Sequence, residues 1–143
     1  MSKRIGVEPK AYEAMQALEN YLHDSGLDKK QFELIKIRAS QINGCAYCIN
    51  MHTKDARALG ETEQRIYALN AWRETPFFTP QERAILALTE EVTNIKHGGV
   101  SDKTYEDAAQ VLDRHYIGKV IMAAVTINAW NRIAISTGMQ PAL

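Results

Sequence analysis

The sequence predicts an all-α fold of six or seven helices in a single domain that spans residues 1–143. Apolar residues recur at spacings of three and four along most of the chain, which is the period of one helix face. No stretch alternates apolar and polar residues between turn signals, so strands are not expected. The four prolines and eight glycines fall mostly where the helical patterns begin or end.

Four helical segments are expected in the first half of the chain, each with an apolar stripe and a stop signal. They cover residues 9–24, 28–43, 45–59 and 62–72. Their stop signals, in the same order, are Gly26, Gly44, Gly60 and Pro76. Asp28 and Gln31 have the spacing of a capping box at the start of the second segment. Gly44 makes only a short connection, so the second and third segments should fold back on each other as a helical hairpin.

Three more helices are expected after Pro76, over residues 79–95, 101–112 and 116–137. The run Thr79-Pro80-Gln81-Glu82 is the clearest start signal, with a capping threonine, a proline at the first helical position and a glutamate three residues after the cap. The last segment is apolar on most faces. We therefore expect it to be the central and most buried helix.

The composition describes one soluble globular domain. The 143 residues are 45% hydrophobic, and 17 Lys and Arg balance 17 Asp and Glu. A chain of this length buries about two-thirds of its unfolded surface, so its core needs no disulfide or metal. Zero net charge without a basic run argues against nucleic acid or an anionic membrane as a partner.

Two further observations concern the compartment. The most apolar segment, residues 117–130, is interrupted by polar residues and is shorter than a membrane-spanning helix. The N-terminal MSKRIGVEP has no apolar stretch of the kind found in secretory signals. We therefore expect a cytoplasmic protein, in which a cysteine pair is more often catalytic or metal-binding than structural.

Cys45 and Cys48 form a Cys-x-x-Cys pair in the expected first turn of the third segment. Backbone N–H groups and the helix dipole favour thiolates there, so we expect a thiol pKa well below the usual value of about 8.5. His52 follows Cys48 by four residues, and at about 100° per residue all three side chains share one narrow helix face. A general base could then reach both sulfurs, directly or through one water.

Glu33 lies on the second segment, which the hairpin should bring against the third. Its carboxylate could approach the sulfurs, and partial burial should raise its pKa and make it a proton acceptor near neutral pH. Lys29 and Lys36 lie one turn away on either side. They offer the alternative of an ordinary surface salt bridge.

Other interpretations of these residues stay open. Cys45, Cys48 and His52 could be three ligands of a structural zinc, but the fourth ligand is missing. The remaining histidines lie near expected helix C-termini, where basic side chains cap: His23, His97 and His115. We expect no metal and no cofactor. A thioredoxin-type module would need a βαβ context, which is absent here, and His52 could also be a satisfied core histidine.

The large apolar side chains allow two interpretations. They could line an apolar pocket, but at helical spacing they more often belong to the core. They comprise the methionines and Trp72, Trp130, Phe77 and Phe78.

Glu33, the run Cys45-Ala46-Tyr47-Cys48 and His52 resemble the alkylhydroperoxidase AhpD-like branch of the carboxymuconolactone decarboxylase family. The resemblance runs through ELIKIRASQINGCAYCINMHTKDARALG, and more loosely onward to the segment 128–132. It implies an AhpD-like helical bundle whose active-site helix lies near a subunit interface, in a homo-oligomer, commonly a trimer or hexamer. It also implies thiol peroxidase chemistry, with Cys48 as the peroxidatic thiolate, Cys45 as the resolving thiol, and His52 and Glu33 as a proton relay.

The same resemblance implies a hydroperoxide substrate and an external dithiol, of lipoyl type in the better known members, as reductant. Some members carry a second histidine between the cysteines, where this chain has Tyr47, so the relay should be shorter or slower. The decarboxylase branch acts on a lactone and lacks the cysteine pair, so its activity is not implied. Two alternatives remain: a non-enzymatic redox sensor or oligomeric interaction module, and a proton-transfer enzyme related to the lactone decarboxylases.

Overall fold

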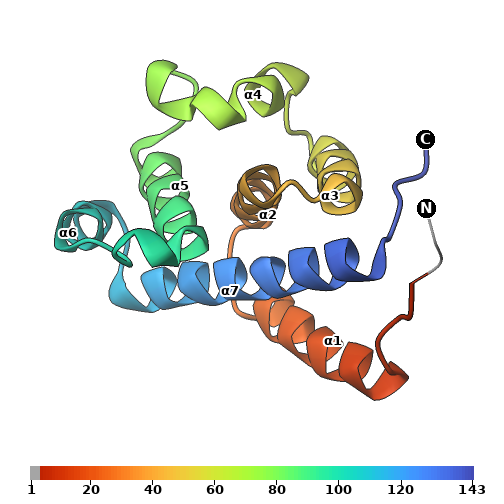
Figure 1. The fold of residues 1–143 in the computed structure, drawn as a ribbon. Helices are drawn as coiled ribbons and strands as arrows, with labels where there is room; N and C mark the ends of the chain where they lie inside the picture. The colour runs from red at the N-terminus through yellow and green to blue at the C-terminus, as the bar shows by residue number, and fades with distance from the viewer. Residues whose placement is uncertain (1–3) are drawn as a thin grey trace.

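The structure, a computed structural model, describes residues 4–143 and contains in that range seven α-helices, two short 3₁₀ helices and no strand (Figure 1). The elements are α1 Pro9–Asp24, α2 Lys29–Asn43, α3 Ala46–Ala58, α4 Glu63–Tyr67, η1 Leu69–Glu74, α5 Pro80–Thr93, η2 Ile95–His97, α6 Asp102–Val111 and α7 Arg114–Thr137. The all-α prediction is confirmed. Residues 1–3, part of the segment in which no secretory signal is expected, lie outside the described residues. None of the described helices combines the length and the apolar character needed to cross a bilayer.

Helix α2 is the centre of the bundle. It buries eight of its 15 residues, and α3, α5 and α7 pack around it (Figure 1). Helix α7 buries eight of its 24 residues. The expectation that the last helix is the central and most buried one is therefore wrong, because α7 lies along one side of the bundle whereas α2 is surrounded.

The start signals predicted for α2 and α5 are found, with one difference at α2. At α5 the capping box is complete, since Glu82 N–H donates to Thr79 Oγ1 at 3.1 Å and Thr79 N–H donates to Glu82 Oε1 at 2.8 Å. At α2 only half of the box forms, with Asp28 Oδ1 accepting from Gln31 N–H at 3.0 Å. The Gln31 side chain instead accepts from the hydroxyl of Tyr116 in α7, a tertiary contact that no local pattern could predict.

The expected helix over residues 62–72 is split into α4 and η1. Ile66, Leu69 and Trp72 are all buried in one small cluster, and their spacing of three matches the 3.0 residues per turn of a 3₁₀ helix. Ala71, with φ −122° and ψ 31°, leaves the helical region between them. Two smaller differences are shifts of helix ends. Helix α5 ends at Thr93 and not at residue 95, and α7 begins at Arg114, which places His115 in its first turn rather than near a C-terminus.

Candidate active site

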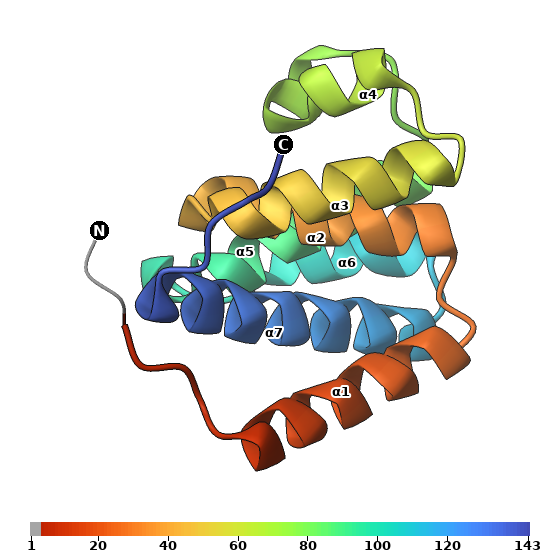
Figure 2. The ribbon, with the colours of Figure 1, turned by 90° about the vertical axis from the view of Figure 1, so that its right-hand side faces the viewer.

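The α2–α3 hairpin carries the cysteine motif. Gly44 ends α2 with φ +70° and ψ 35°, and Cys45 N–H then donates to Ser40 O at 2.9 Å. Figure 2 shows α3 lying alongside α2, as the hairpin prediction requires. Cys45 is the N-cap of α3, with an extended φ of −89° and ψ of 95°, and Cys48 lies in the first turn. The expectation that both cysteines lie in that turn is therefore wrong for Cys45, and the rotation argument holds only for Cys48 and His52.

The two thiols are free and buried, Cys45 at 1% exposure and Cys48 at 4%. Their sulfurs lie 2.6 Å apart. Ser40 and Asn131 hydrogen bond to the Cys48 thiol, and Asn131 Nδ2 also donates to Ser40 Oγ at 2.9 Å. Neither residue was predicted from the sequence. The available signal was an asparagine within the apolar last helical segment, and the structure buries this asparagine fully.

The pKa of the Cys48 thiol is raised from 9.0 to about 12, first by burial and then by the adjacent Cys45. Hydrogen bonds from Asn131 and Ser40 lower the pKa only in part. The expectation of a low pKa is therefore wrong, because the loss of hydration outweighs the favourable helix N-terminus. The resting thiol is protonated at neutral pH, so any reaction of its thiolate needs a base.

Glu33 and His52 form a buried pair. Nδ1 of His52 donates to Glu33 Oε2 at 3.0 Å, and Lys36 Nζ donates to Glu33 Oε1 at 3.3 Å. Burial acts to raise the Glu33 pKa, but the hydrogen bonds and charges of His52 and Lys36 outweigh it, so the net pKa is lowered. The expected rise is therefore wrong, and Glu33 is a buried anion. A carboxylate on Nδ1 holds that proton and leaves Nε2 of His52 as the acceptor.

Lys36 does pair with Glu33, as the salt-bridge alternative expected, but the pair is buried and not at the surface, since the Lys36 side chain is 5% exposed. Its ammonium lies 3.6 Å from the centre of the Phe32 ring and 3.9 Å from Glu19 Oε2. Lys36 is thus an internal cation that stabilises two carboxylates.

His52 does not hydrogen bond to either sulfur among the described residues. The group of side chains with metal-ligand spacing is Glu33, His52 and Asp55, whose ligand atoms lie within 4.8 Å of one another, and it contains no sulfur. The three ligands of the zinc alternative are therefore not gathered. Positive charge beside Glu33 is already supplied by Lys36.

A cavity of about 450 Å³ brings these groups to one surface. Cys48, Glu33 and His52 line it, whereas Cys45 does not. The other lining residues come from α1, α2, α3, α7 and the C-terminal tail: Tyr12, Gln16, Glu19, His23, Lys36, Tyr47, Met51, Asp55, Trp130, Ala134 and Met139. Cys48 is therefore the sulfur that a ligand in the cavity can reach.

The large apolar side chains divide between these roles. Trp130, Met51 and Met139 line the cavity. Trp72 and Phe78 belong to the small core cluster, and Phe77 is 43% exposed.

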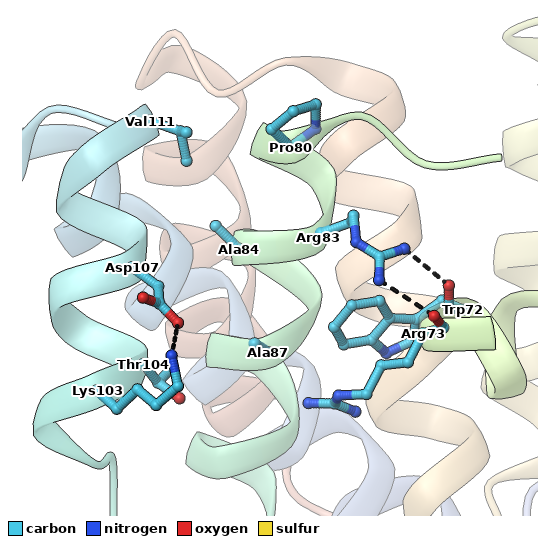
Figure 3. Close-up of a pocket in the computed structure, with 10 residues that line it drawn as sticks. All are labelled: Trp72, Arg73, Pro80, Arg83, Ala84, Ala87, Lys103, Thr104, Asp107 and Val111. Atoms are coloured by element: carbon cyan, nitrogen blue, oxygen red, sulfur yellow. Dashed lines mark hydrogen bonds and ion pairs between the residues drawn. The ribbon is translucent and has the colours of Figure 1, made fainter. Parts of the chain in front are cut away.

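A larger cavity of about 640 Å³ lies between η1, α5 and α6 (Figure 3). Its charged side chains are occupied: Arg83 donates to the backbone carbonyls of Trp72 and Arg73 at 3.1 Å, and Lys103 pairs with Asp107 at 2.8 Å. It holds neither a thiol nor a buried acid–base pair. The smaller cavity at Cys48 is therefore the candidate active site.

Comparison with known proteins gives a family match. Residues 9–91 match the carboxymuconolactone decarboxylase family. The chain is 43% identical to the uncharacterized protein YdfG of Bacillus subtilis over 99% of both proteins. It is 35% identical over 71 residues to the alkyl hydroperoxide reductase AhpD of Streptomyces coelicolor, a match covering 48% of this chain and 40% of that protein.

Solved structures agree with these sequence matches. A protein of unknown function from Agrobacterium tumefaciens, described as a candidate AhpD antioxidant defence protein, superposes with a TM-score of 0.95 at 41% identity over 99% of both chains. The debrominase Bmp8 superposes with a TM-score of 0.83 over 94% of this chain and 72% of that one. At 16% identity it shares the fold alone.

Proposed function

Since this chain belongs to the carboxymuconolactone decarboxylase family, we propose that it is a thiol-dependent alkylhydroperoxidase that uses Cys48, Cys45, His52 and Glu33. One observation carries the proposal. Cys48 shares a cavity with the Glu33–His52 pair, and Cys45 Sγ, which does not line that cavity, lies 2.6 Å from Cys48 Sγ.

The first step is removal of the Cys48 proton. With the pKa of this thiol at about 12, a base is needed at neutral pH, and we propose Nε2 of His52, a residue that lines the cavity, as the acceptor. One water between sulfur and imidazole would carry the proton, and the Glu33 anion stabilises the imidazolium that forms.

In the chemical step the Cys48 thiolate attacks the terminal oxygen of the hydroperoxide and forms an S–O bond. The O–O bond breaks, the alkoxide leaves with its electron pair, and the imidazolium returns the proton to give an alcohol. Cys48 becomes a sulfenic acid. Cys45 then attacks this sulfur, which gives the disulfide and releases water made from the hydroxyl and the Cys45 proton.

An external dithiol closes the cycle by two thiol–disulfide exchanges, which leave the protein reduced and the dithiol oxidised. We propose a lipoyl-type dithiol as this reductant, and a trimer or hexamer as the assembly. Free thiols fit a reducing compartment, so we expect the cytoplasm.

The test is consumption of cumene hydroperoxide with dithiothreitol as reductant, for the wild type, Cys48→Ser and Cys45→Ser. We expect no turnover by Cys48→Ser, and in Cys45→Ser a Cys48 sulfenic acid that dimedone traps. His52→Ala should slow turnover strongly, whereas the matched variant of an exposed imidazole, His115→Ala, should not. Equal rates for the wild type and both cysteine variants would contradict the proposal.

The high pKa of Cys48 favours one alternative, a redox sensor that reacts slowly with peroxide. Slow turnover together with a change of oligomeric state on oxidation would support the sensor over the enzyme.

A further inference from the structure

We propose that the cavity at Cys48 selects its ligands by charge: it accepts uncharged or cationic organic hydroperoxides and dithiols and disfavours those that carry a carboxylate. The identity of these ligands rests on the proposed function. The charge selection itself is a property of the cavity wall and can be measured without turnover.

Negative groups outnumber positive ones on this wall. The ionisable groups are contributed by α1, α2 and α3, whereas α7 and the C-terminal tail contribute uncharged side chains. The carboxylates are Glu19, Glu33 and Asp55, the single ammonium is Lys36, and the imidazoles are His23 and His52. With neutral imidazoles, three negative charges therefore face one positive charge.

The Lys36 ammonium is not available to a ligand. It is buried, and it lies 3.3 Å from Glu33 Oε1, 3.9 Å from Glu19 Oε2 and 3.6 Å from the centre of the Phe32 ring. An entering carboxylate therefore finds no free cation to replace its lost hydration.

Each imidazole also faces carboxylates. His52 Nδ1 lies 3.0 Å from Glu33 Oε2 and 3.7 Å from Asp55 Oδ2. His23 Nε2 lies 3.7 Å from Glu19 Oε2. Protonation of either imidazole would therefore balance a carboxylate already on the wall and not create a site for an anion.

Glu19 is the carboxylate best suited to a test because it has no part in the proposed proton relay. Trp130 Nε1 donates to Glu19 Oε1 at 3.0 Å, and the Glu19 side chain is only 14% exposed, so its charge is held at the wall. Beside it the Tyr12 and Trp130 rings stack with their centres 6.1 Å apart. Aromatic faces next to a carboxylate suit apolar or cationic groups.

The test uses two thiol reagents that share one reaction and differ in charge, iodoacetamide and iodoacetate. Reduced protein is treated with each at mildly alkaline pH and low ionic strength, and modification of Cys48 is followed by peptide mass spectrometry. The ratio of the iodoacetamide rate to the iodoacetate rate is divided by the same ratio measured for the protein unfolded in urea. We expect folding to increase the preference for iodoacetamide by about tenfold. This is the order of effect that one negative charge on the cavity wall should have on the carboxylate of iodoacetate.

Two comparisons isolate the wall charge. Glu19→Gln keeps an acceptor for Trp130 and should lower the preference severalfold, whereas the matched variant Glu13→Gln, on the exposed face of α1, should leave it unchanged. In the wild type, added salt should bring the ratio towards that of the unfolded protein, a measurement that needs no variant. A folded ratio equal to the unfolded one, or a ratio insensitive to both Glu19→Gln and salt, would overturn the proposal.

The peroxidase assay then separates the two proposals. Cumene hydroperoxide is compared with a hydroperoxide of similar size that bears a carboxylate, and we expect faster consumption of the uncharged compound. A charge preference in alkylation without any peroxide consumption would contradict the peroxidase and leave the charge selection standing. Peroxide consumption with no charge preference in either assay would contradict the charge selection and leave the peroxidase standing.

Discussion

Burial of ionisable side chains sets the chemistry of single residues in this protein. The pKa of Cys48 is raised because its thiolate would lose hydration. Glu33 loses hydration too, but His52 and Lys36 more than offset this loss and keep its carboxylate ionised. The resting site therefore holds a neutral Cys48 thiol beside an ionised Glu33 carboxylate that is hydrogen bonded to His52.

The first prediction concerns the thiol. In reduced protein the rate at which iodoacetamide modifies Cys48 should rise about tenfold per pH unit from about pH 7 to about pH 10, because the thiolate fraction is still far from saturation. The same cysteine in urea should level off near its ordinary pKa of 9.0. A plateau near neutral pH in the folded protein would show that the thiolate is stabilised after all.

The second prediction concerns Lys36. Lys36→Met removes a positive charge beside Glu33, so the Glu33 pKa should rise. If the proposed peroxidase activity falls at acidic pH because Glu33 is protonated, that fall should move to higher pH. Leaving the carboxylate without its ammonium should also cost about 3 kcal/mol in the free energy of unfolding. The matched control is Lys29→Met, which removes an exposed lysine of the same helix. A fall of activity at acidic pH that does not move would remove Lys36 from the control of Glu33.

At the scale of elements, turns and caps place the site. Gly44 reverses the chain between α2 and α3 in a left-handed conformation, and a Cβ built there meets no atom within 4 Å. Only conformational strain therefore opposes a side chain at this position. Glu82 links α5 to α4, since it closes the capping box of α5 and accepts from Arg65 Nη1 in α4 at 3.1 Å.

The third prediction is a pair of substitutions with opposite effects. Gly44→Ala should lower the free energy of unfolding by about 1 kcal/mol, the cost of a left-handed alanine. Gly118→Ala, inside α7 and also free of neighbours within 4 Å, should raise it by about 0.5–1 kcal/mol. Urea unfolding of both variants checks this. Effects of the same sign would mean that strain at Gly44 is not the controlling factor.

The fourth prediction concerns pH and the α4–α5 link. Burial acts to raise the Glu82 pKa, but hydrogen bonds from Arg65 and Thr79 lower it below the ordinary 4.5. Because the folded-state pKa is lowered, the stabilisation is fully present above pH 4.5 and is lost as the pH falls through the folded value. In Glu82→Gln the free energy of unfolding should therefore depend less steeply on pH in that acidic range. Glu13→Gln is the control, and an unchanged slope in Glu82→Gln would contradict the assignment.

At the scale of the whole molecule, the cavity joins segments from both ends of the chain. Tyr12 comes from α1 and Met139 from the C-terminal tail, which passes beside α3 in Figure 2. Asn50 Nδ2 and Lys54 Nζ in α3 hold the tail by donating to Ala142 O at 2.9 and 3.3 Å. Access to Cys48 therefore depends on tertiary packing and not on α3 alone.

The fifth prediction follows from this closure. Met139→Ala shortens a side chain of the cavity wall, so modification of Cys48 by a bulky maleimide should accelerate severalfold more than modification by iodoacetamide. Both rates are measured on one variant, so a general loosening of the fold would raise them together. Equal acceleration would mean that Met139 does not control entry.

The sequence predicted what depends on neighbours along the chain. Seven helices, the α5 capping box and the hairpin at Gly44 follow from periodicity and from residues three or four positions apart. The same reasoning predicted that Glu33 could approach the sulfurs, whereas the structure places its carboxylate 3.0 Å from Nδ1 of His52. The prediction of one helix over residues 62–72 was wrong, since the buried residues in its second half have a spacing of three and form a 3₁₀ turn.

By itself, then, the sequence determined the helices, their ends and the spacing of the cysteines and His52, because backbone geometry fixes these within a few residues. Only the tertiary structure decided which charged groups are buried. Lys36 meets Glu19 from another helix, and Asn131 reaches Ser40 across 91 residues of sequence. A pKa depends on hydration and on every nearby charge, and folding sets both, so the directions of the shifts at Glu33 and Cys48 could not be predicted from the chain alone.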